Sequence, residues 1–184
     1  MAADGPNNCG TAADDATVGT VAWTNPTNAQ GAADNSDATC SLSIATSHYL
    51  KCTNFGFSMP TGATVDGVTV TFHRKGSSGS PADSTVKLVV GGSFVGNNKS
   101  AGATWPGTYE DKSFGGAADL WGATITPSDV NASNFGVGIS ATTGLIVVAN
   151  VDSVSITVNY TILGSVAMWQ RRSRQLVNVT DGLN

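Results

Sequence analysis

Hydrophobic and polar residues alternate along several short stretches in the middle of the chain. The clearest stretch is 153–160, where Val154, Ile156, Val158 and Tyr160 are separated by serine, threonine and asparagine. In a segment with a period of two residues, successive side chains lie on opposite faces, and this pattern is typical of a half-buried β-strand. The same pattern predicts strands at 68–72, 86–90 and 135–139. Weaker signals predict strands at 40–46, 49–52, 108–114 and 120–126.

Turn-forming residues separate these stretches, as in Pro60-Thr61-Gly62, Pro106-Gly107 and Gly115-Gly116. About eight short strands at such spacing predict an all-β fold, an antiparallel β-sandwich. A jelly roll is the favoured form. An immunoglobulin-like sandwich is the alternative, but the chain has no Cys…Trp…Cys framework to support it.

The two ends of the chain differ from this middle part. Residues 1–22 are small and polar without any period, which predicts an extended N-terminal arm. Residues 23–163 form the predicted sandwich. Residues 164–184 combine apolar side chains with a basic cluster, and we expect a C-terminal arm that reaches a partner; a final edge strand folded back on the sandwich is the alternative. The expected partner contacts are Cys9, Trp169, Arg171, Arg172, Arg174, Leu176 and Val177.

A short sequence repeat occurs twice in the predicted sandwich. Residues 54–57 (Asn-Phe-Gly-Phe) precede a strand that opens with Val65-Asp66, and residues 134–137 (Asn-Phe-Gly-Val) precede one that opens with Val151-Asp152. We interpret the copies as equivalent hairpins in two halves of one sandwich. Each aspartate is expected to accept backbone N–H groups where the chain joins the sheet.

Composition and charge exclude several classes of function. Charged residues make up only 12% of the 184 residues, and the net charge is −4. No overall positive field exists to attract nucleic acid. No apolar run approaches the roughly 18 residues that a membrane span needs. The first residues lack the basic and apolar regions of a secretory signal, so we expect synthesis in the cytoplasm and no membrane partner.

The three cysteines, Cys9, Cys40 and Cys52, are an odd number. Cys40 and Cys52 could face each other across a hairpin, and Cys9 could contact another chain. Buried free thiols are the simpler interpretation.

Few residues suit catalysis, and we expect no enzyme and no cofactor. His48 and His73 are the only side chains with an ordinary pKa near neutrality, and the sequence assigns no nucleophile to either. Residues 91–100 look superficially like a phosphate-binding loop, but two asparagines separate the last glycine from Lys99. Asp34 and Asp37 are weak candidates for a structural Ca²⁺ site, and no cysteine or histidine spacing indicates zinc.

Trp105 and Trp121 lie in or beside predicted loops. An exposed indole can stack on the C–H face of a sugar ring, so these residues are candidate glycan contacts. Capping of the hydrophobic core is the other interpretation, and the one we favour.

Several strings together resemble a loose group of virion proteins of tailed phages and prophages that are built on small jelly rolls. The strings are 54–60, 63–68, 96–99, Trp105, 119–122, 134–137 and 151–154. The resemblance covers about 23–162 and carries no catalytic signature. It implies a structural role on the virion surface, most simply as a capsid decoration or cement protein, although fibre, collar and tail proteins use such domains as well. The expected partners are the major capsid protein or other virion subunits, together with further copies of this chain, with a trimer favoured.

Two other functions stay open at this point. A carbohydrate-binding module that attaches to host glycans through its loop aromatics is the principal alternative. A hydrolase of surface polysaccharides is the weaker one, because no pair of carboxylates can be assigned to a cleft.

Overall fold

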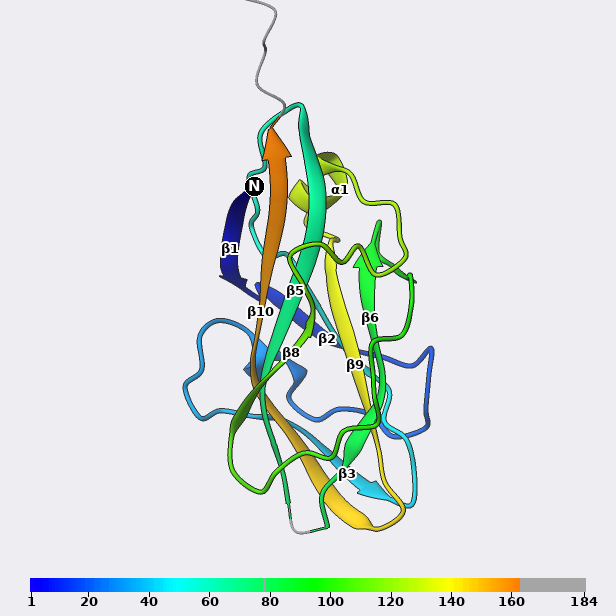
Figure 1. Cartoon of the computed structure of the whole chain (residues 1–184). Coiled ribbons are helices and arrows are strands. Elements are labelled where there is room, and N and C mark those ends of the chain that lie inside the picture. The colour runs from blue at the N-terminus through cyan, green and yellow to red at the C-terminus, as the bar shows by residue number, and fades with distance from the viewer. Residues whose placement is uncertain (78, 163–184) are drawn as a thin grey trace, which may run out of the picture.

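The computed structural model describes residues 1–77 and 79–162, which form two five-stranded β-sheets packed face to face (Figure 1). Sheet A has the order β1-β10-β5-β8, and β3 also pairs with β10. Its strands are β1 (Ala2–Asn8), β3 (Ala38–Ser43), β5 (Ala63–Gly76), β8 (Glu110–Gly115) and β10 (Ile146–Ile162). Sheet B has the order β2-β4-β9-β6-β7. Its strands are β2 (Thr11–Asp15), β4 (Tyr49–Thr53), β6 (Ala82–Val90), β7 (Ser93–Val95) and β9 (Gly136–Thr142). The predicted all-β sandwich is therefore confirmed.

The last eight strands pair in a nested way. β3 pairs with β10, β4 with β9, β5 with β8 and β6 with β7, and every pair is antiparallel. The chain thus runs out along four strands and returns along the next four, with successive pairs placed in alternate sheets. Sheet contacts in this arrangement join residues far apart in sequence, as in Ala38 with Val151.

Residues 1–22 do not form the expected arm. β1 pairs with the second half of β10, from Ala2 with Tyr160 to Asn8 with Ser155. β2 pairs with β4 along its whole length. Both are edge strands held mainly by backbone hydrogen bonds. Their side chains need no apolar period, and the sequence pattern therefore missed them.

The expected strand at 120–126 is also wrong. These residues form turns and loop that lead into the short helix α1 (Pro127–Asn131). Thr126 caps this helix, because its side chain accepts from the Asp129 N–H while the Asp129 carboxylate accepts from the Thr126 N–H. A 3₁₀ turn, η1 (Pro26–Ala29), lies in the connection from β2 to β3.

The core lies between the two sheets. Alternate side chains of the central strands point into this core. Sheet A contributes the fully buried Val68, Val70 and Phe72 from β5 and Val154, Ile156 and Val158 from β10. Sheet B contributes the fully buried Val86 and Leu88 from β6 and Val137 and Ile139 from β9. Burial of such side chains contributes about 25 cal/mol per Å² of apolar area, which makes it the main force holding the sheets together.

The two ends of the sandwich differ. Ala2 pairs with Tyr160, so the N-terminus and the end of β10 lie at one end of the molecule (Figure 1). At the opposite end the turn between β9 and β10 leaves Leu145 and Ile146 exposed, and the Ile44 N–H donates to the Leu145 carbonyl over 3.0 Å. No helix among the described residues is long and apolar enough to cross a membrane.

Candidate functional site

Trp105 and Trp121 are both completely buried, so the expected glycan contacts through these two residues are wrong. The Trp121 Nε1–H donates to the Val68 carbonyl over 2.9 Å. The Trp105 Nε1–H donates to Asp83 Oδ1 over 2.8 Å. Each indole therefore packs in the core with its polar N–H satisfied, and the core interpretation is confirmed.

Asp34 and Asp37 do not converge on a cation. The Asp34 carboxylate accepts from the Ser36 N–H over 2.8 Å. Asp37 pairs with Lys75 Nζ at 3.2 Å and accepts from the Tyr109 hydroxyl over 2.9 Å. Lysine already neutralises Asp37, and the described residues contain no group of three potential metal ligands among histidine, cysteine, aspartate and glutamate.

The three cysteines are free and buried, as the simpler interpretation predicts. Cys9 is only 1% exposed, so its expected contact with another chain is wrong for this fold. Its thiol contacts that of Cys52, and this contact lowers the pKa of Cys9. The same contact, together with burial, raises the pKa of Cys52 well above its ordinary value. Burial raises the pKa of Cys40 to about 12, with the Asp14 carboxylate adding to the effect.

Each histidine pairs with an aspartate. His48 Nδ1 lies 2.8 Å from Asp14 Oδ2, and Asp14 Oδ1 also accepts from the Trp23 N–H over 2.8 Å. His73 Nδ1 lies 2.7 Å from Asp111 Oδ1. The hydrogen bonds of His48 and Asp14 link β2 to the residue just before β4 and to the segment after β2, at the β2 edge of sheet B.

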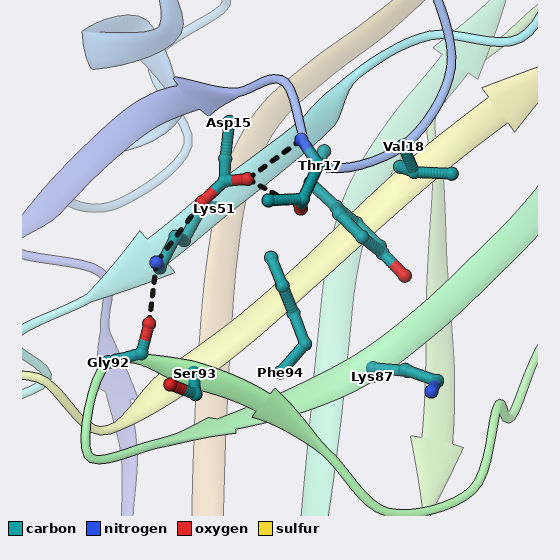
Figure 2. A pocket seen from close by; sticks show the side chains of 9 residues that line it. Asp15, Thr17, Val18, Lys51, Lys87, Gly92, Ser93 and Phe94 are labelled. Carbon is teal, nitrogen blue, oxygen red and sulfur yellow. Dashed lines mark hydrogen bonds and ion pairs between the residues drawn. The ribbon is translucent and has the colours of Figure 1, made fainter.

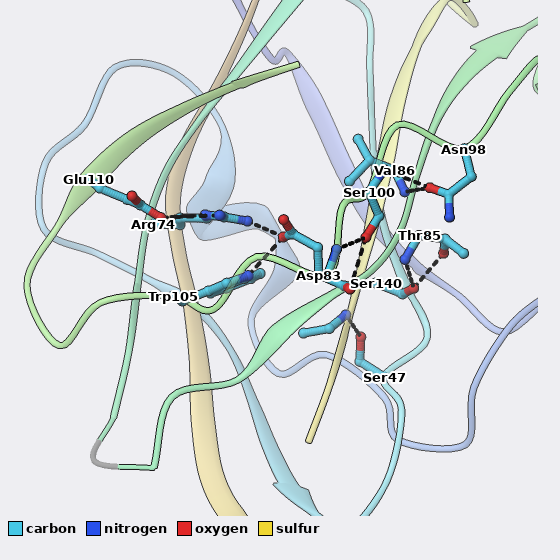
Figure 3. Close-up of polar contacts among 12 residues, drawn as sticks. Ser47, Arg74, Asp83, Thr85, Val86, Asn98, Ser100, Trp105, Glu110 and Ser140 are labelled. Atoms are coloured by element: carbon cyan, nitrogen blue, oxygen red, sulfur yellow. Dashed lines mark hydrogen bonds and ion pairs between the residues drawn. The ribbon is translucent and has the colours of Figure 1, made fainter. Parts of the chain in front are cut away.

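A buried polar cluster that the sequence did not reveal joins the two sheets (Figure 3). Arg74 of β5 is fully buried and pairs with Asp83 of β6. Arg74 Nε and Nη2 both donate to Glu110 Oε1 over 3.1 Å, and the guanidinium lies 4.7 Å from the Trp105 ring centre. Arg74 occupies an inward position in an alternating strand, where the period alone predicts an apolar residue. These groups engage one another and reach from sheet to sheet, which assigns the cluster a structural role.

A pocket lined by both charged and aromatic side chains lies on the outer face of sheet B (Figure 2). It has a volume of about 440 Å³. Its lining comprises Asp15, Thr17, Val18, Tyr49, Lys51, Lys87, Gly92, Ser93 and Phe94. The rings of Tyr49 and Phe94 stack at 3.9 Å between centroids. We call this the sheet B pocket.

Gly138 in the central strand β9 makes room for the two rings. A Cβ at this position would lie 2.5 Å from Phe94 Cε1 and 3.2 Å from Tyr49 Cδ1. Lys51 and Lys87 both pair with Gly138, one from each neighbouring strand. The bare backbone of Gly138 is thus flanked by two lysines and covered by two aromatic rings.

The charges on one side of the sheet B pocket are compensated. Lys51 Nζ donates to Asp15 over 3.2 Å and to the Gly92 carbonyl over 2.7 Å. Asp15 Oδ1 accepts from the Thr17 N–H and hydroxyl over 3.1 and 2.6 Å. Burial raises the pKa of Asp15, but the bonds from Thr17 and Lys51 outweigh burial and hold the pKa below its ordinary 3.8. Lys87, across the pocket, forms no ion pair with any residue in the described ranges.

The remaining predicted contacts, Trp169, Arg171, Arg172, Arg174, Leu176 and Val177, lie outside the described residues. Sequence reasoning also missed the sheet B pocket. The alternation in the sequence places Tyr49, Lys51 and Lys87 on the outward face of their strands. It does not show that these strands pair on either side of Gly138, and that pairing is what brings the three residues together. Comparisons with models of protein families, with curated proteins and with solved structures found no match.

Proposed function

We propose that this chain is a non-enzymatic structural protein of a phage virion, a capsid decoration or cement protein that binds the shell at the virion surface. The resemblance of 23–162 to small jelly-roll virion proteins supports this class of function. The partner would be the major capsid protein or another virion subunit, and assembly would take place in the host cytoplasm.

The jelly roll itself is part of this proposal. Two four-stranded orders, β3-β10-β5-β8 and β4-β9-β6-β7, are contained in the two sheets. Eight consecutive strands in four nested antiparallel pairs correspond to two joined Greek keys, which is the arrangement of a jelly roll. β1 and β2 are then additions that extend one edge of each sheet.

The observation that carries the proposal is the separation of charge along the chain. Asp181 is the only acidic residue after position 162, whereas Arg171, Arg172 and Arg174 all follow it. Residues 1–162 therefore carry a formal charge of −6 and the final 22 residues +2. β10 ends at Ile162, at the same end of the sandwich as the N-terminus (Figure 1). A basic segment at one end of an acidic body suits attachment in a fixed orientation.

Arginine is well suited to such attachment, because its planar guanidinium forms paired hydrogen bonds with a carboxylate. We propose that Arg171, Arg172 and Arg174 bind carboxylates on an acidic shell, with Trp169, Leu176 and Val177 contributing apolar contacts. Each bound copy would favour the assembled shell by linkage.

Heat and osmotic shock test the cementing role. Phage particles that lack this chain should release their DNA at lower temperature, or after milder osmotic shock, than complete particles. Adding back the wild-type chain should restore resistance, whereas a chain with Arg171→Glu, Arg172→Glu and Arg174→Glu should not. Equal resistance of particles with and without the chain contradicts the proposal.

A homotrimer is the favoured assembly, and light scattering of the purified chain measures it. The matched comparison is a chain that ends at Ile162, because every described strand lies within residues 2–162. A trimeric full-length chain and a monomeric shorter chain would assign assembly to residues 163–184. A full-length monomer contradicts self-assembly in solution.

A further inference from the structure

We propose that the sheet B pocket binds a carboxylated sugar, such as a uronic acid residue of a surface polysaccharide. The proposal goes beyond attachment to a shell and does not depend on it. The pocket and the end of β10 belong to different sheets, so a chain bound through its C-terminal segment can present the pocket as well.

The position of the pocket on the sheet gives it a fixed floor. Tyr49, Lys51 and Lys87 project from the strands on either side of β9. Phe94 comes from β7, which pairs with β6, while Thr17 and Val18 follow β2 (Figure 2). Four strands of sheet B, or the connections next to them, thus hold the lining residues around β9, and the site is formed before any ligand binds.

The unused hydrogen-bonding groups of the pocket define the ligand. Among residues 1–77 and 79–162, Lys87 forms no ion pair, and the hydroxyls of Tyr49 and Ser93 form no hydrogen bond with another residue. Lys51 uses two of its three N–H donors. Asp15 already accepts from Thr17 and Lys51. The pocket therefore offers free donors and one unpaired positive charge, and it favours an anion that is rich in acceptor oxygens.

The apolar part of the lining selects for more than an inorganic anion. Val18 and the half-buried Phe94 ring, which stacks on the buried ring of Tyr49, supply hydrocarbon surface beside the donors. The C–H face of a pyranose can cover such a surface, while its hydroxyls accept from Tyr49 and Ser93. A volume of about 440 Å³ lies within the usual range for a small-ligand site. A sugar with a carboxylate directed at Lys87 would use all of these features.

NMR titration of the full-length chain tests this inference with three probes: methyl β-glucuronide, methyl β-glucoside and acetate. The glucuronide should perturb the resonances of Lys87, Tyr49 and Ser93 and bind at least about tenfold more tightly than either other probe, as expected for one charge-assisted hydrogen bond together with ring contact. The glucoside lacks the charge and acetate lacks the ring.

Lys87→Gln should weaken binding of the glucuronide about tenfold and bring it close to that of the glucoside. Lys87→Arg keeps the charge and should keep most of the binding. The matched control is Lys112→Gln, which removes the same charge from β8 in the other sheet and should leave the affinity unchanged. The spectrum of each variant shows directly whether it is folded.

Four results would overturn the proposal. The first is the absence of any perturbation by the glucuronide at millimolar concentration. The second is equal affinity for glucuronide and glucoside, which would remove the role of Lys87. The third is equal weakening by Lys87→Gln and Lys112→Gln, which would show that only net charge matters. Binding of acetate as tight as that of the glucuronide would likewise reduce the pocket to a simple anion site and contradict the sugar assignment.

Discussion

Cys9 and Cys52 are the residues whose chemistry the fold changes most. They are far apart in sequence, yet their thiols touch in the core, and Cys9 Sγ also lies 3.2 Å from the Thr11 carbonyl and 3.8 Å from the Thr53 carbonyl. The pKa of Cys9 is lowered and that of Cys52 raised. Cys9 and Cys52 are only 1% and 0% exposed, so the folded core should shield both thiols from an oxidant.

We predict that oxidised glutathione does not modify the folded chain, because the thiols are not accessible to it. In urea the exposed thiols should react by thiol–disulfide exchange, with gain of glutathione or with loss of hydrogens, about 2 Da for each disulfide formed. Mass spectrometry of the treated chain measures both results. Modification of Cys9 in the folded chain would contradict the prediction.

Asp119 gives a pH dependence with a defined sign. Lys99 Nζ lies 2.7 Å from its carboxylate, and this bond, together with one from the Trp121 N–H, holds the pKa of Asp119 below its ordinary 3.8 despite some burial. A lowered pKa means that the stabilisation is complete above about pH 4 and is lost as the pH falls through the folded-state value.

We therefore expect Asp119→Asn to lower the free energy of unfolding at neutral pH by up to about 1 kcal/mol, a modest value because the side chain is 35% exposed. The difference from wild type should shrink steadily below pH 4 in urea titrations. Lys99→Gln should remove the larger share of this pH-dependent part, while the bond from the Trp121 N–H keeps the rest. A difference that stays constant with pH would contradict the account.

The short sequence repeat shows how much of the bonding of a single residue could be predicted. Asp152 accepts from the Asp34 and Asn35 N–H groups over 3.1 Å each, as expected of an aspartate that binds backbone. Asp66, its counterpart, instead accepts from the Thr161 hydroxyl over 2.6 Å. The sequence could indicate the type of bond but not the partner, because loops distant in sequence supply the donors.

At the scale of the strands, alternation predicted β5, β6, β9 and β10 correctly because each has one face in the core. β1, β2 and β7 lie at or beside sheet edges and have little apolar alternation, so they were missed. The sheet B pocket was missed for a related reason. Its residues come from β2, β4, β6 and β7, and only the pairing of these strands through β9 brings them together.

Arg74 of β5 and Asp83 of β6 join the two sheets through the core, so we expect their removal to lower the stability of the fold. Arg74→Met should lower the free energy of unfolding by about 3–5 kcal/mol, since it leaves the buried Asp83 carboxylate without a cation. Asp83→Asn should cost less, about 1–3 kcal/mol, because Arg74 keeps its bonds to Glu110. The double variant should lose about 2 kcal/mol less than the sum of the two, as measured by denaturant unfolding.

Trp105→Phe is the matched control for this cycle. It removes the N–H that Asp83 accepts but keeps an aromatic ring beside Arg74, so it should cost only about 1–3 kcal/mol. Strictly additive effects of Arg74→Met and Asp83→Asn would show that the two residues do not act as a pair.

At the scale of the whole molecule, the sandwich has two different ends. The N-terminus and the end of β10 lie together at one end (Figure 1), and the uncharged turn with Leu145 and Ile146 lies at the other. The two parts of the sequence also differ in charge: residues 1–162 are acidic and residues 163–184 are basic. The proposed attachment to a shell through one end of the molecule would use this difference in charge.

Co-sedimentation of the purified chain with shells that lack it is the most direct test of the central claim. We predict saturable binding that weakens as salt is raised and is lost in the variant with Arg171→Glu, Arg172→Glu and Arg174→Glu. Lys51, Arg74, Lys75, Lys87, Lys99 and Lys112 stay in place in that variant, so the body is unchanged. Failure of the wild-type chain to sediment with the shells, or equal binding by the variant, would contradict attachment through the basic segment.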